Sequence, residues 1–249
     1  MTALVPHVRL LGRDFADFDT SQAASWLANR PAGAPFGYVV TPNADHLVRL
    51  GRHPELAELY DSALLCLLDS RVVARAAWSL GLPTPQVIPG SDLTARILRW
   101  DLQPFERITV IGLHPDQLDA LIARTGIMRP AHHCPPMGFE HNSRALSAAV
   151  DFVVANPARF VLLAVGSPRQ EILAAAIQMT GQATGTGLCI GASLDFLSGA
   201  ATRAPIWMQR AGLEWLHRLV SNPRRMARRY FCDCPGIFPL LLRERLLSL

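Results

Sequence analysis

Residues 160–171 read FVLLAVGSPRQE and carry the pattern that decides the fold. The six consecutive apolar residues are long enough for a buried strand and shorter than a typical buried helix. Gly166 then permits a tight turn, and Pro168 suits the first turn of a helix. The stretch therefore predicts one buried strand followed directly by a helix.

The same pattern recurs along the first 200 residues. Apolar runs at 37–41, 64–68, 107–112 and 186–190 each precede turn residues and a helical segment. This alternation predicts an α/β protein with a Rossmann-like, mostly parallel sheet flanked by helices. The stretch 126–142 is rich in proline and histidine, and we predict a long irregular loop or lid there.

The chain changes character after residue 199, where the strand-helix alternation stops. Residues 203–230 contain seven arginines among tryptophan, leucine and methionine, and Glu214 is their only acid. Apolar spacing over 206–220 predicts one amphipathic helix, and Pro223 is placed to begin another. We therefore predict an α/β core over 1–198 and an arginine-rich amphipathic helical appendage over 199–249.

Composition narrows the classes of protein. Half of the 249 residues are hydrophobic, so the chain can bury a large core, and a net charge of +4 is too small to imply nucleic-acid binding. The sequence shows no signal peptide and no run near the ~20 apolar residues that span a bilayer. Five scattered cysteines suit reduced thiols. We expect a cytoplasmic protein, with the appendage suited to a membrane surface.

Asp69 is the first candidate for chemistry. It ends the apolar run at 64–68, so its carboxylate is predicted to lie at the carboxyl edge of the sheet, where functional side chains gather. A carboxylate there can take a proton from an attacking hydroxyl. The alternative is that Asp69 caps the helix beginning at Ser70, because aspartate is a preferred N-cap residue. Thr41 and Asn43 have the same two readings, as ligand contacts or as caps.

Other candidates lie in the polar turns and on the C-terminal helices. The turn at 166–171 offers backbone amides for an anion or hydroxyl site, and in the turn at 89–93 either Ser91 or Asp92 is predicted to cap a helix. On a single helix, arginines 218, 225 and 229 would share one face. The predicted substrate-binding residues are Thr41, Asn43, Gly90, Asp92, Gly166, Gln170, Glu171 and Asp195.

Four motifs in this order resemble the WecG/TagA/CpsF family of bacterial glycosyltransferases. They are TPNADH at 41–46, GSDL at 90–93, GSPRQE at 166–171, and the long block from DFLSGAATRAP at 195–205 through LEWLHRL to Arg229. The likeness covers residues 41–230. It joins segments that lie far apart in the sequence into one expected site.

The resemblance implies inverting transfer of a sugar from a UDP-sugar to a polyprenyl-diphosphate-linked saccharide in bacterial surface-polysaccharide synthesis. It implies action at the inner face of the cell membrane, with no cofactor and no required metal. Asp69 matches the family's proposed base, and Arg218, Arg225 and Arg228 match appendage arginines thought to close over the donor diphosphate. N-acetylmannosamine and glucose are the donor sugars that this likeness favours.

The chain departs from the family pattern close to the predicted pocket. Ser70 stands where the family usually has glycine, Val87 where it often has arginine, and residues 192–195 read ASLD in place of GAFD. These changes leave the donor sugar and the acceptor open.

Two other functions compete with this reading. An arginine- and tryptophan-rich protein could bind nucleic acid or another anion without catalysis, although its basic residues alternate with apolar ones at core-like spacing and no known nucleic-acid module is present. A nucleotide hydrolase with a phosphate-binding loop is excluded, because that loop requires a lysine and the chain has none.

Overall fold

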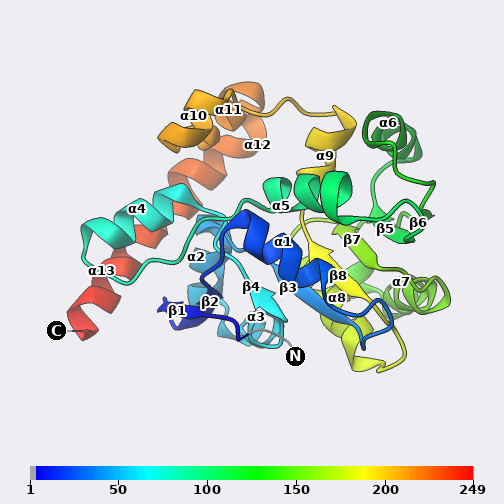
Figure 1. Cartoon of the computed structure of the whole chain (residues 1–249). Coiled ribbons are helices and arrows are strands. Elements are labelled where there is room, and N and C mark those ends of the chain that lie inside the picture. The colour runs from blue at the N-terminus through cyan, green and yellow to red at the C-terminus, as the bar shows by residue number, and fades with distance from the viewer. Residues whose placement is uncertain (1–3, 249) are drawn as a thin grey trace.

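The computed structural model describes residues 4–248, apart from the side chain of Arg225 (Figure 1). Its centre is a six-stranded sheet in the order β4-β3-β8-β7-β5-β6, in which every pairing is parallel. The strands are β3 Gly37–Val40, β4 Leu65–Cys66, β5 Ile108–Gly112, β6 Ala131–His133, β7 Phe160–Ala164 and β8 Thr186–Cys189. The predicted α/β fold with a parallel sheet is confirmed.

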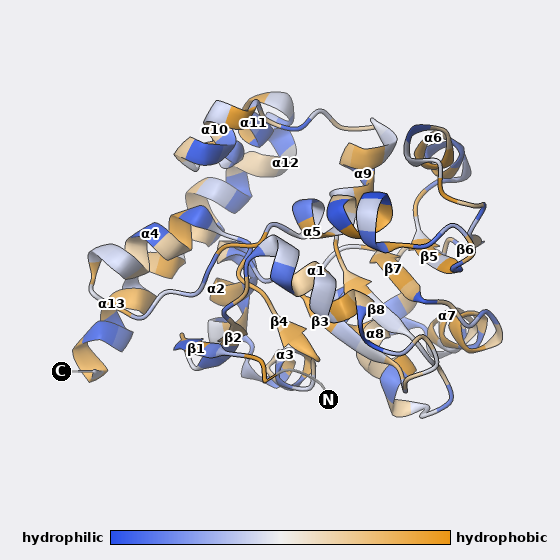
Figure 2. Ribbon diagram, in the orientation of Figure 1, coloured by the Kyte–Doolittle hydropathy of each residue, from blue (hydrophilic) through white to orange (hydrophobic). Residues whose placement is uncertain are grey.

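Helices cover both faces of this sheet because both faces are apolar. Successive strand side chains point in opposite directions, so Tyr38 and Val40 enter one core cluster while Val39 enters the other. Figure 2 shows β4, β7 and β8 as strongly apolar elements. The first cluster is covered by α2 Ala44–Arg52, α4 Arg71–Ser79, α7 Ser143–Ala155 and α8 Arg169–Met179. The second is covered by α1 Thr20–Ala28, α5 Gly90–Arg96, α6 Pro115–Thr125 and α9 Ser193–Ser198.

Smaller elements complete the first 200 residues. An antiparallel hairpin, β1 His7–Leu10 and β2 Arg13–Ala16, forms a separate two-stranded sheet. The short helix α3 is Glu58–Asp61, 3₁₀ turns occupy Pro54–Leu56 and Phe139–His141, and a π-helical turn occupies Ile97–Asp101.

Three local predictions are wrong. Residues 126–142 are not wholly irregular, because Ala131–His133 pair with β5 as an edge strand that has no apolar run to announce it. Helix α5 begins at Gly90 with Pro89 at its N-cap position, so neither Ser91 nor Asp92 caps it. The single helix expected over 206–220 is divided at Gly212, whose left-handed φ of +73° ends one helix before the next begins.

The C-terminal segment folds as a series of short helices and then a longer one. They are α10 Ile206–Ala211, α11 Glu214–Ser221, α12 Pro223–Arg228, a π turn at Arg229–Asp233, a 3₁₀ turn at Cys234–Gly236, and α13 Ile237–Leu247. Pro223 begins α12, as predicted. Helix α13 returns to the body of the protein, where it packs on α2 and α4 and buries Ile237 and Leu241. Within residues 4–248, no helix is both long and apolar enough to cross a bilayer.

Candidate functional site

A cavity of about 300 Å³ lies where the carboxyl ends of β3 and β4 meet the C-terminal helices. Its floor is formed by the starts of α2 and α4, and its cover by α11 and residues 229–238. The polar or charged side chains that line it include Asn43, Asp69, Arg71, Glu214, Arg218 and Arg229. This volume is at the lower end of the range for small-molecule sites in proteins.

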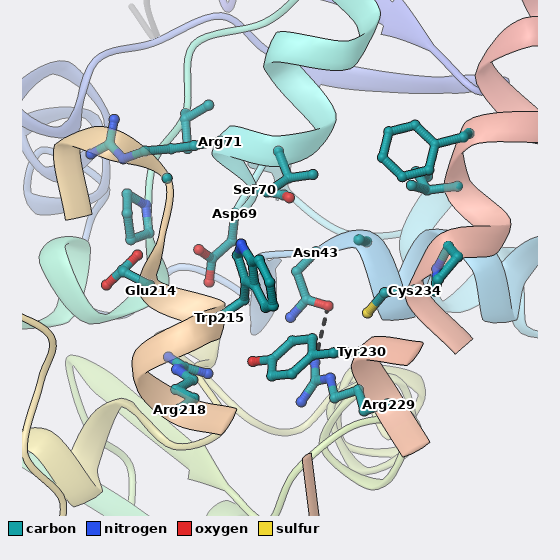
Figure 3. Close-up of a pocket in the computed structure, with 18 residues that line it drawn as sticks. Asn43, Asp69, Ser70, Arg71, Glu214, Trp215, Arg218, Arg229, Tyr230 and Cys234 are labelled. Carbon is teal, nitrogen blue, oxygen red and sulfur yellow. Dashed lines mark hydrogen bonds between the residues drawn. The ribbon is translucent and has the colours of Figure 1, made fainter. Parts of the chain in front are cut away.

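Asp69 enters this cavity because the chain around it is held from both sides. Leu68 forms a parallel bridge with Val87, and the backbone N–H of Asp69 donates to Pro42 O at 3.0 Å. Ser70, not Asp69, caps α4, since the Ser70 hydroxyl accepts from the Val73 N–H at 3.2 Å. The interpretation of Asp69 as a helix cap is therefore wrong, and its carboxylate faces the cavity (Figure 3).

The surroundings of Asp69 shift its proton affinity. Burial raises the pKa of its carboxyl group from the ordinary value of 3.8 to about 7, and the nearby charges of Glu214 and Asp92 add to the increase. The positive charge of Arg218 and a hydrogen bond of 3.3 Å from the Gly90 N–H oppose it. Asp69 can consequently exchange a proton near neutral pH, as a general base must.

Helix α11 brings a second carboxylate and a guanidinium to the same end of the cavity. Glu214 and Arg218 are one helical turn apart and both face Asp69 in Figure 3. The Glu214 carboxylate accepts from Arg203 Nε at 3.4 Å, and Arg203 also binds the carboxylate of Asp92. The guanidinium of Arg218 lies 5.1 Å from the centre of the Phe196 ring, which fixes its direction.

Arg229 ties the C-terminal segment to the start of α2. The Asn43 side chain accepts from the Asp45 N–H at 3.1 Å and so caps α2, and Arg229 NH2 donates to the same Asn43 oxygen at 3.1 Å. Arg229 also lies 3.5 Å from the Asp45 carboxylate. Its Nε is buried and has no hydrogen-bond partner, and the same is true of Arg71 Nε. Both arginines line the cavity.

The turn at 166–171 does not line this cavity and is held by hydrogen bonds of its own side chains. Gln170 Nε2 donates to Glu171 Oε1 at 2.8 Å, and Gln170 Oε1 accepts from the Gly191 N–H at 2.8 Å. Glu171 is fully buried, and burial raises the pKa of its carboxyl group. These bonds connect the turn after β7 to the turn after β8.

The structure brings together only some of the predicted site residues. Asn43, Asp69 and Arg218 line the cavity. Gly90 supports Asp69 through its N–H, and Thr41 lies against Gly90 with its hydroxyl donating to Cys189 O at 3.3 Å. Besides Gly90 and Thr41, the predicted residues that do not line the cavity are Asp92, Gly166, Gln170, Glu171, Asp195 and Arg228, the last of which is exposed. The side chain of Arg225 lies outside the described part of the chain.

Several cavity residues were absent from the predicted site. Arg229 was aligned with Arg218 by helical spacing, and Glu214 stood out as the only acid of the basic segment, so the sequence held a signal for both. The sequence held no such signal for Arg71, Trp215 or Tyr230. Among residues 4–248, no group of three or more histidine, cysteine, aspartate or glutamate side chains is arranged to hold a metal ion.

Comparison with known proteins agrees with the motifs. The family model described as "Glycosyl transferase WecG/TagA/CpsF family" matches residues 8–248. A protein of Bacillus spizizenii (strain ATCC 23059 / NRRL B-14472 / W23) is 27% identical over 219 residues, which cover 86% of this chain and 83% of the relative. That relative is named N-acetylglucosaminyldiphosphoundecaprenol N-acetyl-beta-D-mannosaminyltransferase.

Proposed function

The chain belongs to the WecG/TagA/CpsF family of glycosyl transferases, and from that premise we propose that it moves a sugar from a UDP-sugar to a polyprenyl-diphosphate-linked saccharide. The diphosphoundecaprenol in the relative's name supports this acceptor class. Transfer of N-acetylmannosamine or glucose fits the resemblance, and the product would serve a bacterial surface polysaccharide. We further propose that the reaction inverts the anomeric centre and needs no metal ion.

One observation carries the proposal. A carboxylate with a pKa near 7, that of Asp69, shares a cavity with the guanidinium groups of Arg218 and Arg229. The pairing of a proton acceptor with fixed positive charges suits a reaction in which a hydroxyl attacks and a diphosphate leaves.

Asp69 would act first, by accepting the proton of the acceptor hydroxyl as its oxygen attacks the anomeric carbon. The bond from that carbon to the UDP oxygen breaks on the opposite side, which gives inversion. Negative charge then grows on the departing diphosphate, and forked guanidinium donors stabilise it in a cavity with little water. A carboxylate with a pKa near neutrality is ionised in a large fraction of molecules and still binds the proton it receives.

The arginines would divide this work according to their positions. Arg218 faces Asp69, and Arg229 and Arg71 also line the cavity. We therefore add Arg71 and Arg229 to the predicted diphosphate ligands. Arg225 and Arg228 remain predictions from the family likeness, and Arg228 would have to move toward the cavity to take part because it is exposed here.

We also propose that residues 199–249 act as an appendage that closes the site and holds the enzyme to the inner face of the cell membrane. Ile206, Trp207, Val220 and Phe231 are all at least 65% exposed, beside the arginines of α10 to α12. Exposed apolar and cationic side chains together suit an anionic lipid surface.

The membrane proposal predicts that Trp207→Ser reduces sedimentation with anionic vesicles, because a large apolar anchor is lost. Trp78→Ser is the matched control, since Trp78 is also exposed but lies on α4. Equal sedimentation of the two variants and the original protein would exclude α10 as a membrane contact.

A donor panel tests the reaction. Purified protein is incubated with a set of UDP-sugars and a prenyl-diphosphate-linked GlcNAc acceptor, while UDP release and product mass are followed. We expect one donor to be used, and Asp69→Asn to lower the rate about 10²- to 10⁴-fold without loss of folding. Asp116→Asn, on the exposed side of α6, should leave the rate unchanged. Absence of transfer from every donor contradicts the proposed function.

A further inference from the structure

The cavity is lined by charged side chains and by an apolar wall. Asp69, Glu214 and Arg218 gather at one end, and Cys234 marks the other, next to the pale red ribbon of the C-terminal segment (Figure 3). Around the remainder of the wall, α4 contributes Val72, the segment before α5 contributes Val87, and α13 contributes Ile237 and Phe238. A sugar nucleotide has no large aliphatic group that would require such a wall.

The apolar wall continues out of the cavity along α13. Phe238, Leu242 and Leu246 are spaced by four residues and therefore share one side of the helix. They are 52%, 50% and 64% exposed, whereas Ile237 and Leu241 on the neighbouring side are buried in the core. Phe238 belongs both to the cavity wall and to this side of α13, so the two apolar surfaces are continuous.

We propose that this continuous surface binds the first isoprene units of the acceptor lipid. The inference rests on the proposed function, because it requires that the acceptor be a saccharide joined through a diphosphate to a polyprenyl chain. In such a molecule the reacting hydroxyl, the diphosphate and the lipid follow one another in a fixed order. When the hydroxyl lies at Asp69, the lipid must leave the site about one sugar and one diphosphate away.

The order of groups along the wall matches the order of groups in that acceptor. Asp69 lies at the end that holds Glu214 and Arg218, and Arg229 lies nearer Cys234 (Figure 3). Phe238 lines the cavity from α13. Arg229 also lines the cavity, and a guanidinium group is a strong partner for a diphosphate. A chain of isoprene units beyond it would cover Phe238 first and Leu242 one helical turn later.

The occupant we infer is a single lipid chain and not the bilayer surface. A bilayer contact would explain the exposed side of α13, but it would not explain why the apolar surface enters a cavity that contains the catalytic carboxylate. Phe238 and Leu242 are each about half exposed, so one chain lying over them removes apolar area from water on both molecules. Burying the exposed halves of these two side chains is enough to change the affinity for the lipid about tenfold.

The test uses two soluble acceptors in the absence of membranes and detergent micelles. Both are GlcNAc-diphosphate lipids, one with a single isoprene unit and one with three. For the original protein, we expect the KM for the three-unit acceptor to be about tenfold lower than the KM for the one-unit acceptor.

Leu242→Ser should raise the KM for the three-unit acceptor about fivefold and leave that for the one-unit acceptor unchanged. Phe238→Ser should raise both. Leu247→Ser, on the opposite side of α13, is the matched control and should alter neither.

Binding is measured in parallel, through quenching of tryptophan fluorescence by the three-unit acceptor, with the same variants. If transfer occurs but acceptor length and Leu242→Ser have no effect, the lipid subsite is wrong and the proposed function stands. If the three-unit acceptor binds in a manner that depends on Leu242 while no UDP-sugar is used, the lipid subsite stands and the transfer reaction is wrong. If Leu242→Ser weakens only sedimentation with vesicles, the surface binds a bilayer and the inference fails.

Discussion

At the scale of single residues, the chemistry of the site depends on the charges placed around one carboxylate. Burial and Glu214 raise the pKa of Asp69, and Arg218 lowers it, so two residues of α11 act on the same group in opposite directions. A base must be ionised to accept a proton. The rate is therefore expected to rise as pH increases through about 7, the pKa of Asp69.

Two substitutions test this arrangement. Glu214→Gln removes a negative charge, so the pKa of Asp69 should fall and the rise in kcat/KM should occur at lower pH. Arg218→Gln removes a positive charge, so the rise should occur at higher pH, along with a loss of roughly 10²-fold in maximal rate. The measurement is a pH profile of kcat/KM over about two pH units on each side of neutrality, the region in which Asp69 is expected to ionise. Shifts in the same direction for both variants would show that Asp69 does not control the profile.

At the scale of elements, the break between α10 and α11 determines where Glu214 and Arg218 lie in the cavity. Gly212 adopts φ +73°, and the guanidinium of Arg75 on α4 donates to the carbonyl groups of Arg210 and Ala211 just before it. This link sets where α11 begins. Since α11 carries Glu214 and Arg218, its start determines whether both reach Asp69.

Gly212→Ala should therefore reduce activity as well as stability. A Cβ at this position would lie 3.0 Å from Arg75 NH1, in a backbone conformation that costs alanine about 1 kcal/mol. We expect a loss of about 1 kcal/mol or more in the free energy of unfolding, and a lower kcat. Gly33→Ala is the control, because no atom lies within 4 Å of the added Cβ and its φ is not left-handed. An unchanged kcat in Gly212→Ala would show that the break between α10 and α11 does not affect catalysis.

At the scale of the whole molecule, the N-terminal hairpin and the C-terminal helix α13 are joined. Both carboxylate oxygens of Glu244 on α13 accept from the backbone N–H of Leu11, at 2.9 and 2.7 Å. Leu11 is the residue after β1 and has a left-handed φ of 51°. The hairpin β1-β2 and α13 are therefore held together by a charged acceptor as well as by the core that Ile237 and Leu241 enter.

Glu244→Ala should lower the free energy of unfolding by about 1–3 kcal/mol, because a partly buried N–H loses a charged partner. Arg243→Ala, at an exposed position on the same helix, is the matched control and should change it by no more than about 0.5 kcal/mol. Chemical denaturation followed by circular dichroism measures both. Equal stability of the two variants would mean that this bond does not hold the hairpin and α13 together.

The sequence by itself determined the parallel α/β core and the place of Asp69 at its carboxyl edge. Apolar runs and the turns after them are local patterns, and strand direction follows from their alternation with helices. Arg218 was also found locally, through the arginine-rich block and its likeness to a family. The edge strand β6 was missed because Ala131–His133 gain their strand form from pairing with β5 and not from their own side chains.

Only the tertiary structure decided which side chains share the cavity. Helical spacing placed arginines 218, 225 and 229 on one face of a single helix. The chain in fact bends at Asn222 and enters a π turn at Arg229–Asp233, and contacts with other segments, such as that of Arg229 with Asn43, set where these side chains lie. The tertiary structure also decided that Ser70 and not Asp69 caps α4, and that Arg71 and Glu214 line the cavity. It likewise decided that α13 returns to the core. Each depends on contacts between segments far apart in sequence, and a local pattern carries no information about such contacts.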